Sequence, residues 1–284
     1  MPRLLLTALG LALAASAVAG VIVIASDQRQ DPARCPPPLQ AGPTRCCAPG
    51  QAEIDGRCEG KALECPSHMS LVAGSCVAAS GRVVLGPGRL RVGPSDWEAQ
   101  GRVEARDVAV PAFELDVTEV EHHRFRACSA AGKCPALAAS EPGRPVTGLH
   151  PEQAAAFCRF VGGRLPTSDE WLFAAAGSAG RRFPWGQTGL VCRRSSFGLV
   201  AGPCGEGRGG PEITAARPSG RSPEGLYDLS GNVAEWTSEP GGGFVARGGS
   251  YASQLAADLK SWAAKPFAGA SPEVGFRCAY SLAR

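Results

Sequence analysis

The longest apolar segment of the chain is an uncharged run over residues 4–25, close to the N-terminus. As a helix, a run of this length would extend about 33 Å, which is enough to cross the hydrocarbon core of a bilayer. Arg3 precedes the run and Asp27 follows it. This charge order keeps the N-terminus inside and sends the rest of the chain outward, so the pattern predicts a membrane anchor.

A cleavable signal peptide explains the same run. The small residues Ala17, Val18 and Ala19 form a plausible cleavage site, although cleavage there would leave the apolar residues 21–24 on the mature chain. A buried core helix is a third interpretation. The first two place residue 35 onward outside the cytoplasm, where disulfides persist.

Short apolar segments predict four strands after residue 81. They cover residues 83–85, 90–92, 108–110 and 113–115, and the first two are separated by Gly-Pro-Gly.

Three helices are predicted after these strands. The first begins at Thr118, with Glu121 completing a capping box, and stops before Gly132. The second has Pro151 in its first turn and ends at residues 162–163, and its apolar face consists of Ala154, Phe157, Cys158 and Val161. The third follows a capping box at residues 167–170 and runs through Trp171 to Gly177.

Beyond Gly177 the chain is rich in Gly, Pro and Ser, and the whole chain contains 37 Gly and 24 Pro. We therefore expect an α+β fold with much irregular backbone, and we exclude a helical bundle or coiled coil. The net charge of +3 gives no electrostatic support for nucleic-acid binding.

Twelve cysteines change the picture, because they are too many for an ordinary cytosolic enzyme of this length. Half of them form three pairs of equal spacing, Cys35 with Cys46, Cys47 with Cys58, and Cys65 with Cys76. This spacing predicts three short repeats, each a turn closed by its own disulfide, although six cysteines allow fifteen connectivities. Zinc is the alternative, but the stretch has no CxxC pair and only His68 nearby. We divide the chain into residues 1–25 (signal or anchor), 26–34 (linker), 35–80 (cysteine-rich repeats) and 81–284 (main domain).

Six segments of the main domain occur in the order found in one family. They are FELDVTEV (113–120), GGRLPTSDEW (162–171), FPWG (183–186), GLYDLSGNVAEWT (225–237), RGGSY (247–251) and GFRC (275–278). In these motifs residues 82–284 resemble the formylglycine-generating, or sulfatase-modifying-factor, family. The resemblance implies a compact, loop-rich fold related to C-type lectins.

The resemblance also implies how the domain's cysteines pair. Cys158 and Cys278 match two family cysteines that are bonded to each other. Cys128 with Cys134, and Cys192 with Cys204, flank short loops and make sensible local pairs. All six cysteines of the domain are then structural.

The family carries a calcium site at the motif of residues 225–237. By resemblance, the ligands here are the side chains of Asp228 and Glu235 and the backbone carbonyls of Gly231 and Val233, oxygen ligands of the kind that calcium prefers. Taken alone, this spacing is also that of an ordinary polar turn. A second family calcium site uses an asparagine that residues 192–197 lack.

The family's oxidases hold copper between two thiols that lie five residues apart. The matching positions here are Ser253 and Asp258, and only Ser250, an active-site neighbour in the family, is retained. A hydroxyl and a carboxylate are poor ligands for Cu(I), so we do not expect copper. Cys128 and Cys134 are six residues apart on another segment and do not replace the thiols.

The histidines offer little other chemistry. His122 and His123 point about 100° apart on a helix, so they cannot readily share a metal, and we expect both to be exposed on the helix surface. His150 precedes Pro151 and is expected to shape a helix start.

The sequence thus favours an exported, noncatalytic member of this family, a pseudoenzyme that binds a peptide, protein or glycan and is stabilised by disulfides and calcium. The alternatives are a formylglycine-generating oxidase that acts on a protein cysteine, and a subunit of an envelope assembly. An uncleaved segment 4–25 would add contact with a membrane, and nucleic acid is not an expected partner.

Overall fold

A computed structural model describes residues 38–41, 46–54, 57–65, 69–72, 74–78, 81–92, 105–190, 192–205 and 209–282. The predicted anchor or signal at residues 4–25, the linker and Cys35 lie outside these residues. Among the described residues, no helix combines the length and the apolar character needed to span a bilayer.

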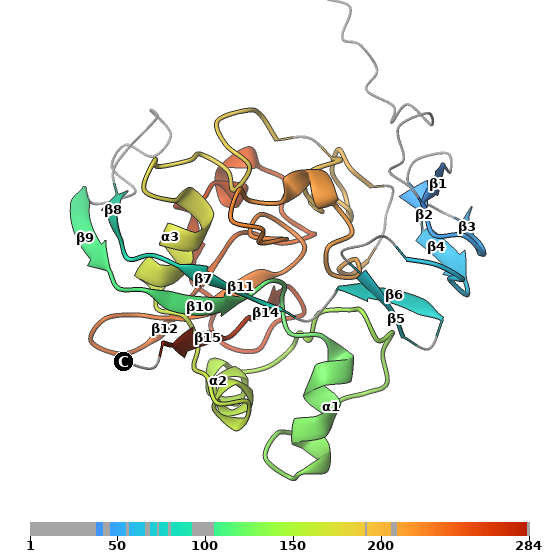
Figure 1. Ribbon diagram of the computed structural model, residues 1–284, viewed down its shortest axis with the longest axis horizontal. Coiled ribbons are helices and arrows are strands. Elements are labelled where there is room, and N and C mark those ends of the chain that lie inside the picture. Colours follow the sequence, from blue (N-terminus) through green and yellow to red (C-terminus); the bar gives the residue numbers. More distant parts are fainter. Residues whose placement is uncertain are drawn as a thin grey trace, which may run out of the picture.

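The four predicted strands are all present in the first part of the main domain (Figure 1). Strand β10 (Phe113–Asp116) lies between β7 (Arg82–Leu85) and β15 (Ala279–Ser281) in an antiparallel three-stranded sheet. Strands β8 (Gly88–Val92) and β9 (Arg106–Val110) form a separate hairpin. The sheet therefore joins the beginning of the domain to its C-terminal end.

A second sheet has the order β13-β12-β11-β14 and was not predicted from the sequence. It consists of β11 (Ala234–Ser238), β12 (Phe244–Arg247), β13 (Ala264–Lys265) and β14 (Val274–Gly275). Strands β11 and β14 are parallel, whereas the other pairs are antiparallel. Two of the four strands are only two residues long, which is too short for a hydrophobic period to reveal them.

Helix α1 (His122–Ala130) begins four residues later than predicted. Thr118 and Glu121 do not form a capping box. The preceding backbone pairs with other segments instead: Val117 N–H donates to the Gly81 carbonyl at 3.0 Å, and Val120 N–H donates to the Phe276 carbonyl at 2.8 Å. These long-range bonds use the backbone of residues 117–120 and exclude the first helical turn that the sequence pattern favoured.

Helices α2 (Pro151–Phe160) and α3 (Ser168–Ala176) agree with the prediction. Pro151 is the first residue of α2. At the start of α3, Thr167 Oγ1 accepts from Glu170 N–H at 3.2 Å, and Glu170 Oε2 accepts from Thr167 N–H at 2.8 Å. This reciprocal capping satisfies two backbone donors that would otherwise lack partners. Among the described residues there are also two short 3-10 helices, η2 (Pro218–Gly220) and η3 (Ala256–Leu259).

The domain has two main groups of buried apolar side chains. In the first, α1 and α2 pack on the second sheet, and the ring centroids of Phe125 and Phe157 lie 5.2 Å apart. In the second, Trp171 and its neighbours on α3 pack against β7 to β10. Val120 belongs to the first group and Leu115 to the second, so the segment that connects β10 to α1 links the two.

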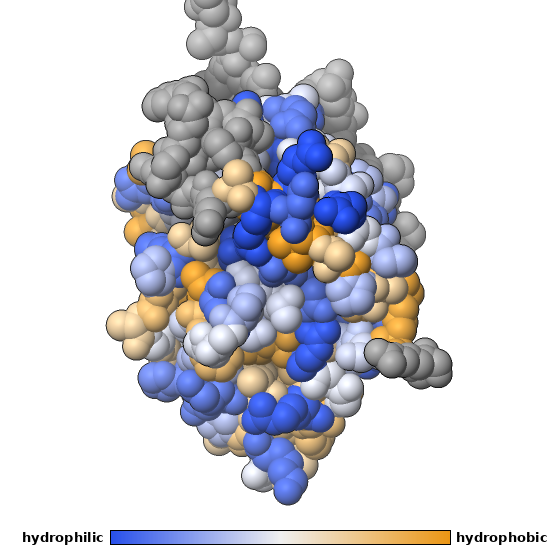
Figure 2. Space-filling model, turned by 90° about the vertical axis from the view of Figure 1, so that its left-hand side faces the viewer, coloured by the Kyte–Doolittle hydropathy of each residue, from blue (hydrophilic) through white to orange (hydrophobic). Residues whose placement is uncertain are grey.

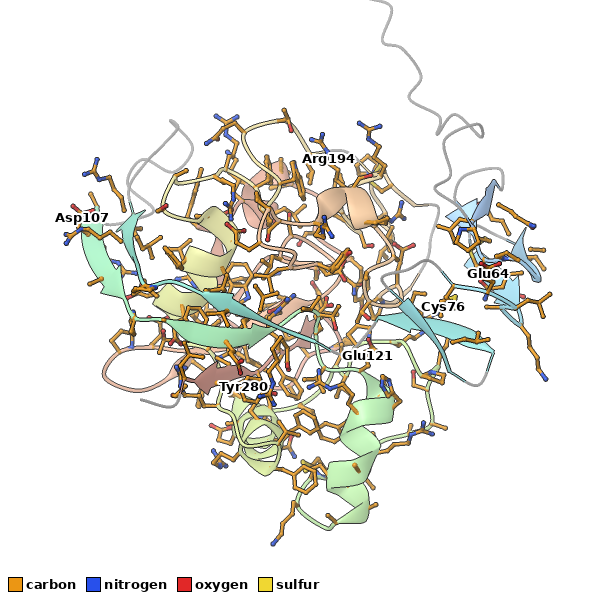
Figure 3. All side chains as sticks on the ribbon, in the orientation of Figure 1. Glu64, Cys76, Asp107, Glu121, Arg194 and Tyr280 are labelled. Atoms are coloured by element: carbon orange, nitrogen blue, oxygen red, sulfur yellow. A yellow bond between two sulfur atoms is a disulfide. The ribbon has the colours of Figure 1, made fainter. Side chains whose placement is uncertain are left out.

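The cysteine-rich stretch forms small hairpins beside the domain. In two described repeats a cysteine precedes a hairpin and bonds to a cysteine in its second strand, so that Cys47 pairs with Cys58 and Cys65 with Cys76. The strands are β1 (Gln40–Ala41), β2 (Cys46–Cys47), β3 (Gln51–Ile54), β4 (Arg57–Gly60), β5 (Met69–Val72) and β6 (Ser75–Ala78). The expected bond between Cys35 and Cys46 lies outside the described residues. Figure 3 places Cys76, on β6, at the opposite end of the molecule from Asp107, on β9.

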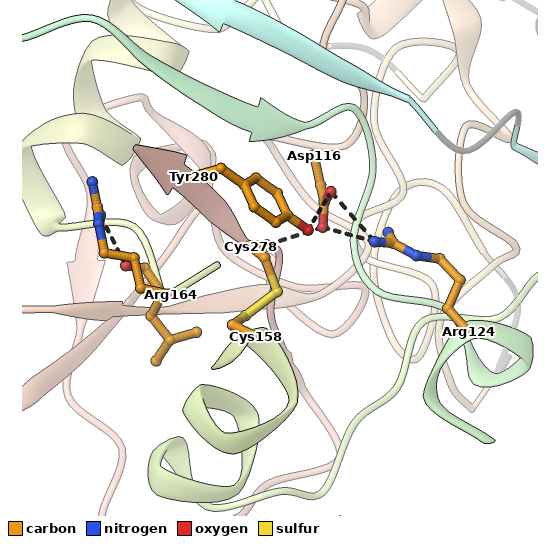
Figure 4. Close-up of a disulfide and its surroundings, with 7 residues drawn as sticks. Asp116, Arg124, Cys158, Arg164, Cys278 and Tyr280 are labelled. Carbon is orange, nitrogen blue, oxygen red and sulfur yellow. Dashed lines mark hydrogen bonds and ion pairs between the residues drawn. A yellow bond between two sulfur atoms is a disulfide. The ribbon is translucent and has the colours of Figure 1, made fainter. Parts of the chain in front are cut away.

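The domain's cysteines are bonded in the pairs expected from the sequence. Cys158 is joined to Cys278, Cys128 to Cys134, and Cys192 to Cys204. Beside the first bond, Asp116 accepts from the Cys278 N–H and from the Tyr280 hydroxyl, each at 3.2 Å (Figure 4). Arg124 on α1 also contacts this carboxylate, so the C-terminal strand is fixed by a covalent bond and a polar network together.

The side of the molecule that carries β8 and β9 is mixed in character. Arg89 and Arg91 are exposed while Leu90 and Val92 are buried, as expected for a hairpin with one face on the core. In the space-filling view, hydrophilic groups on this side lie next to small apolar ones (Figure 2).

Candidate functional site

A cavity of ≈ 190 Å³ opens at the second sheet. Its lining comes from β11, β12, β13, η3 and the loop before β14. The lining residues are Ala234, Ala246, Gly249, Ser250, Ser253, Asp258, Ala263, Ala264, Lys265, Phe267 and Glu273. The cavity therefore brings together Ser250, Ser253 and Asp258, the three positions that the sequence singled out by resemblance.

The two serines are held by a tight turn after β12. Ser250 N–H donates to Ser253 Oγ at 3.0 Å, and Ser253 N–H donates back to the Ser250 carbonyl. Ser250 Oγ accepts from the Ala252 N–H at 3.2 Å and donates to Glu273 Oε2 at 2.5 Å. Ser250 is buried, so its hydroxyl is a fixed part of the cavity wall.

Glu273, Lys265 and Phe267 also line the cavity, and sequence reasoning missed all three. Glu273 directly precedes β14, and the parallel pairing of β14 with β11 places it beside the cavity. Phe267 packs edge-on against Trp236, with centroids 6.2 Å apart, and the Lys265 ammonium lies 5.1 Å from the centroid of the Phe267 ring. The position of Glu273, two residues before the GFRC motif, was the one available signal.

The cavity is negatively charged overall. Asp258 and Glu273 contribute two carboxylates and Lys265 one ammonium. Burial raises the pKa of the neighbouring Tyr251 hydroxyl above its ordinary value, and the charge of Glu273 adds to the rise. No thiol or imidazole is present among the described lining residues, so they offer neither a ligand suited to Cu(I) nor a histidine base for either serine.

The predicted calcium ligands lie in a different place, within the buried polar core of the domain. Glu235 on β11 is fully buried and binds the Arg277 guanidinium through both oxygens, at 2.6 and 2.7 Å. The same carboxylate accepts from Trp171 Nε1 at 2.7 Å. Arg277 also donates to the backbone carbonyls of Asp116, Val117 and Tyr227. This guanidinium joins four segments of the chain. In its motif, GFRC, only Cys278 had been assigned a role from the sequence.

Two further carboxylates lie close to this ion pair. Asp228 has a left-handed backbone with φ 58°, and its Oδ2 accepts from the Ala215 N–H at 2.6 Å. Glu119 is fully buried; its Oε1 accepts from Asn232 Nδ2 at 3.1 Å, and its Oε2 has no hydrogen-bond partner. Three carboxylates thus surround one guanidinium.

Burial and the excess of negative charge raise the pKa values of two of these carboxyl groups. Burial raises the pKa of Asp228 to about 6, and the charge of Glu235 acts in the same direction. Burial also raises the pKa of Glu119 well above its ordinary value, and the charge of Asp228 adds to the effect. The pair formed by Glu119 and Asp228 is therefore suited to hold a proton near neutral pH.

The same contacts bear on the predicted calcium ion. Both oxygens of Glu235 already bind Arg277, and in the described part of the chain no group of three or more acidic, histidine or cysteine side chains is arranged to hold a metal. A cation at this position would compete with the guanidinium, so the arrangement does not fit calcium as it stands. Asp228, Gly231 and Val233 lie on one turn before β11, and calcium binding there remains a prediction.

The histidines are less exposed than expected. His122 and His123 are both half-buried on α1, and His123 Nδ1 lies 2.9 Å from Glu121 Oε2 and 3.1 Å from the Pro142 carbonyl. The loop over residues 141–145 covers this side of α1, which the helical pattern alone does not show. His150 precedes α2, and its N–H donates to Gln153 Oε1 at 2.9 Å, so it does shape the helix start.

Fold and cavity together define a disulfide-bonded α+β domain whose pocket holds serine and carboxylate groups. Residues 69–282 match the family described as "Sulfatase-modifying factor enzyme 1-like domain". The chain belongs to this family.

Among curated proteins, the chain is 34% identical over 157 residues to "Inactive C-alpha-formylglycine-generating enzyme 2" of Mus musculus, covering 49% of this chain and 50% of that protein. It is 33% identical over 108 residues to "Formylglycine-generating enzyme" of Mycobacterium tuberculosis, covering 35% and 34%. The chain spans about half or less of the length of these relatives.

Solved structures share the fold. "Treponema denticola variable protein 1" superposes with a TM-score of 0.59 at 18% identity, covering 75% of this chain and 98% of that one. "Structure of PvdO from Pseudomonas aeruginosa" gives a TM-score of 0.57 at 20% identity, covering 73% and 95%.

Proposed function

We propose that this protein is a noncatalytic member of the family, a module that binds a ligand in the cavity at the second sheet. The observation that carries the proposal is the presence of Ser253 and Asp258 at the positions of the family's copper-binding thiols. Both residues line the cavity, and none of the cysteines in the described part of the chain is free. The pocket is thus retained without the sulfur chemistry. The similarity to a relative named as inactive supports the same conclusion.

The disulfides further support a location outside the cytoplasm. Five bonds join described residues, and bonds of this kind persist in an oxidising compartment. The apolar run at residues 4–25 is of the length needed for export as a signal or anchor. We propose that the domain is exported.

One experiment tests the absence of catalysis. The purified protein is incubated with copper, oxygen and a peptide that carries the sulfatase-type cysteine, and the peptide is analysed by mass spectrometry. We expect no formylglycine above a control without protein, because a hydroxyl and a hard carboxylate cannot form the Cu(I) bis-thiolate. Turnover above the control would reject the proposal and restore an oxidase.

A titration of free thiols under denaturing, nonreducing conditions supplies the complementary measurement. A copper oxidase of this family needs two free or exchangeable thiols, whereas a binding module of the kind proposed should show none. Two reactive thiols per chain would contradict the proposal even if no suitable peptide substrate were found.

A further inference from the structure

We propose that the cavity at the second sheet binds a primary ammonium group on an alkyl stem, as carried by a lysine side chain of a partner protein. This inference rests on the proposed function, namely that the cavity binds and does not catalyse. It specifies what the cavity recognises.

The shape of the cavity suits an alkyl stem. Its inner wall includes the buried methyl groups of Ala234 and Ala246, and the Phe267 ring forms a further apolar surface. The volume of ≈ 190 Å³ exceeds the cavity of about 150 Å³ that holds a benzene ring in another protein. An unbranched side chain of four methylene groups can therefore enter and cover apolar surface on the way.

The charge of the cavity suits a cation. Two carboxylates oppose one ammonium, so an anion entering the pocket would meet net repulsion. Glu273 is half-buried next to Ser250, where a charge is screened less than at an exposed surface. Burial raises the pKa of the Tyr251 hydroxyl, and the negative charge of the nearby Glu273 raises it further.

The hydrogen bonding favours an ammonium over a guanidinium. Glu273 and Asp258 come from separate segments of the cavity lining, and a planar guanidinium holds its donors in one fixed fork. An ammonium has three rotatable donors and needs only single contacts, which Glu273 and Asp258 can supply separately.

Lys265 shows how a cation lies against this wall. Its ammonium is 5.1 Å from the centroid of the Phe267 ring, a distance at which the ring face attracts a positive charge. Lys265 is exposed, so its ammonium lies toward the solvent side of the cavity. A ligand ammonium bound to Glu273 would be repelled by Lys265, and removing that charge should strengthen binding.

The test uses the full chain with its disulfides intact and four small probes: N-acetyl-lysine methylamide, the same compound acetylated on its side-chain nitrogen, N-acetyl-arginine methylamide, and 1,5-diaminopentane. Affinities are measured by NMR titration at low salt. We expect the lysine compound to bind more tightly than the arginine compound and the acetylated compound to lose binding. Binding of 1,5-diaminopentane alone, without the lysine compound, would overturn the assignment to a lysine side chain.

Variants identify the contact. Glu273→Gln retains the acceptor for Ser250 but removes the charge, and we expect it to weaken binding of the lysine compound by about tenfold, typical of a lost charged hydrogen bond. Lys265→Met should strengthen binding. Glu152→Gln, on the exposed start of α2, is the matched control and should leave the affinity unchanged.

The outcomes separate this inference from the proposed function. If the protein produces no formylglycine but binds the acetylated compound as tightly as the lysine compound, the inference fails and the binding module remains. Unchanged affinity in Glu273→Gln, or no binding of any probe, also overturns the inference. Formylglycine production would instead reject the proposed function on which it rests.

Discussion

Arg277 is a fully buried charge that links several segments of the domain. Its guanidinium is fully buried and contacts Glu235 together with three backbone carbonyls. A buried charge that loses its partner is costly, whereas an exposed ion pair contributes little. The contribution of an ion pair in this domain should therefore differ sharply with its position.

We predict that Arg277→Met lowers the free energy of unfolding by about 3–5 kcal/mol, because Glu235 would remain charged without its partner. Chemical denaturation with the disulfides intact measures this change. Arg91→Met is the control, since Arg91 pairs with Asp107 at an exposed site; its effect should be below about 1 kcal/mol. Equal losses in the two variants would show that the buried pair has no special role.

Glu119 and Asp228 predict a dependence of stability on pH. Their pKa values are raised in the folded protein, so the folded state binds protons more tightly than the unfolded chain, and the free energy of unfolding falls as the pH rises between the two pKa values. For Asp228 this interval runs from 3.8 to about 6. The contribution is thus fully present below about pH 4 and lost above about pH 6.

We expect Glu119→Gln to raise the melting temperature at neutral pH and to have less effect at acidic pH. The glutamine keeps an acceptor for Asn232 and removes one buried charge next to Asp228. Thermal unfolding in the presence of a chelator, from acidic to neutral pH, measures the difference. The exposed Glu152→Gln serves as control, and a loss of stability at neutral pH in Glu119→Gln would contradict this account of the cluster.

At the scale of elements, the start of a helix was predicted correctly where its capping bonds are local, and wrongly where distant segments bond to the same backbone. The capping box at Thr167 and the proline at residue 151 fixed α3 and α2 as predicted, because their bonding partners lie within the same turn. The equivalent pattern at Thr118 failed, because the backbone there bonds to residues 81 and 276. Such pairing depends on distant segments and leaves no local pattern.

The second sheet was not predicted for the same reason, and neither was the place of Glu273 in the cavity. Ser250, Ser253 and Asp258 were located by resemblance, since they lie within or near one motif. Glu273 reaches them only through the parallel pairing of Ala234 with Val274. Strands of two residues carry no hydrophobic period, so the pairing could not be inferred from the sequence, and the nearby GFRC motif was the one signal for the carboxylate.

Removing the cap of α3 should have a measurable effect. We predict that Thr167→Ala lowers the free energy of unfolding by about 1 kcal/mol, because the Glu170 N–H loses its acceptor at the helix start. Ser178→Ala, at an exposed position just after the helix, is the matched control and should be neutral. Chemical denaturation compares the two, and no difference between them would argue against the cap as a source of stability.

Calcium binding at the turn before β11 can be tested directly. If calcium binds only the folded protein, about 1 mM calcium should raise the melting temperature after chelation of carried-over metal. Asp228→Asn should abolish the rise while tolerating the left-handed backbone, whereas Asp107→Asn should retain it. No rise in the wild type would contradict calcium binding at this turn.

At the scale of the whole molecule, the disulfides connect parts that the sequence places far apart. The hairpins near the N-terminus are closed over short loops, with cysteines 11 residues apart. The bond between Cys158 and Cys278 instead spans 120 residues and includes α3, the cavity and the whole second sheet. Long loops of this kind gain the most from closure in the chain-entropy account.

This long bond makes residues 158–278 a covalent ring. Any two residues of the ring are therefore connected both through the backbone between them and through the disulfide. A single cut at the exposed Phe244, as by a chymotrypsin-like protease, would open the ring without releasing β13, β14 or β15. On a gel, the nicked protein should migrate as one chain without reductant and as two fragments with it. Release of a C-terminal fragment without reductant would exclude the bond. Damage at the exposed start of β12 would thus have no effect on the chain's integrity until the molecule enters a reducing environment, where the same cut would detach the strands that build the pocket.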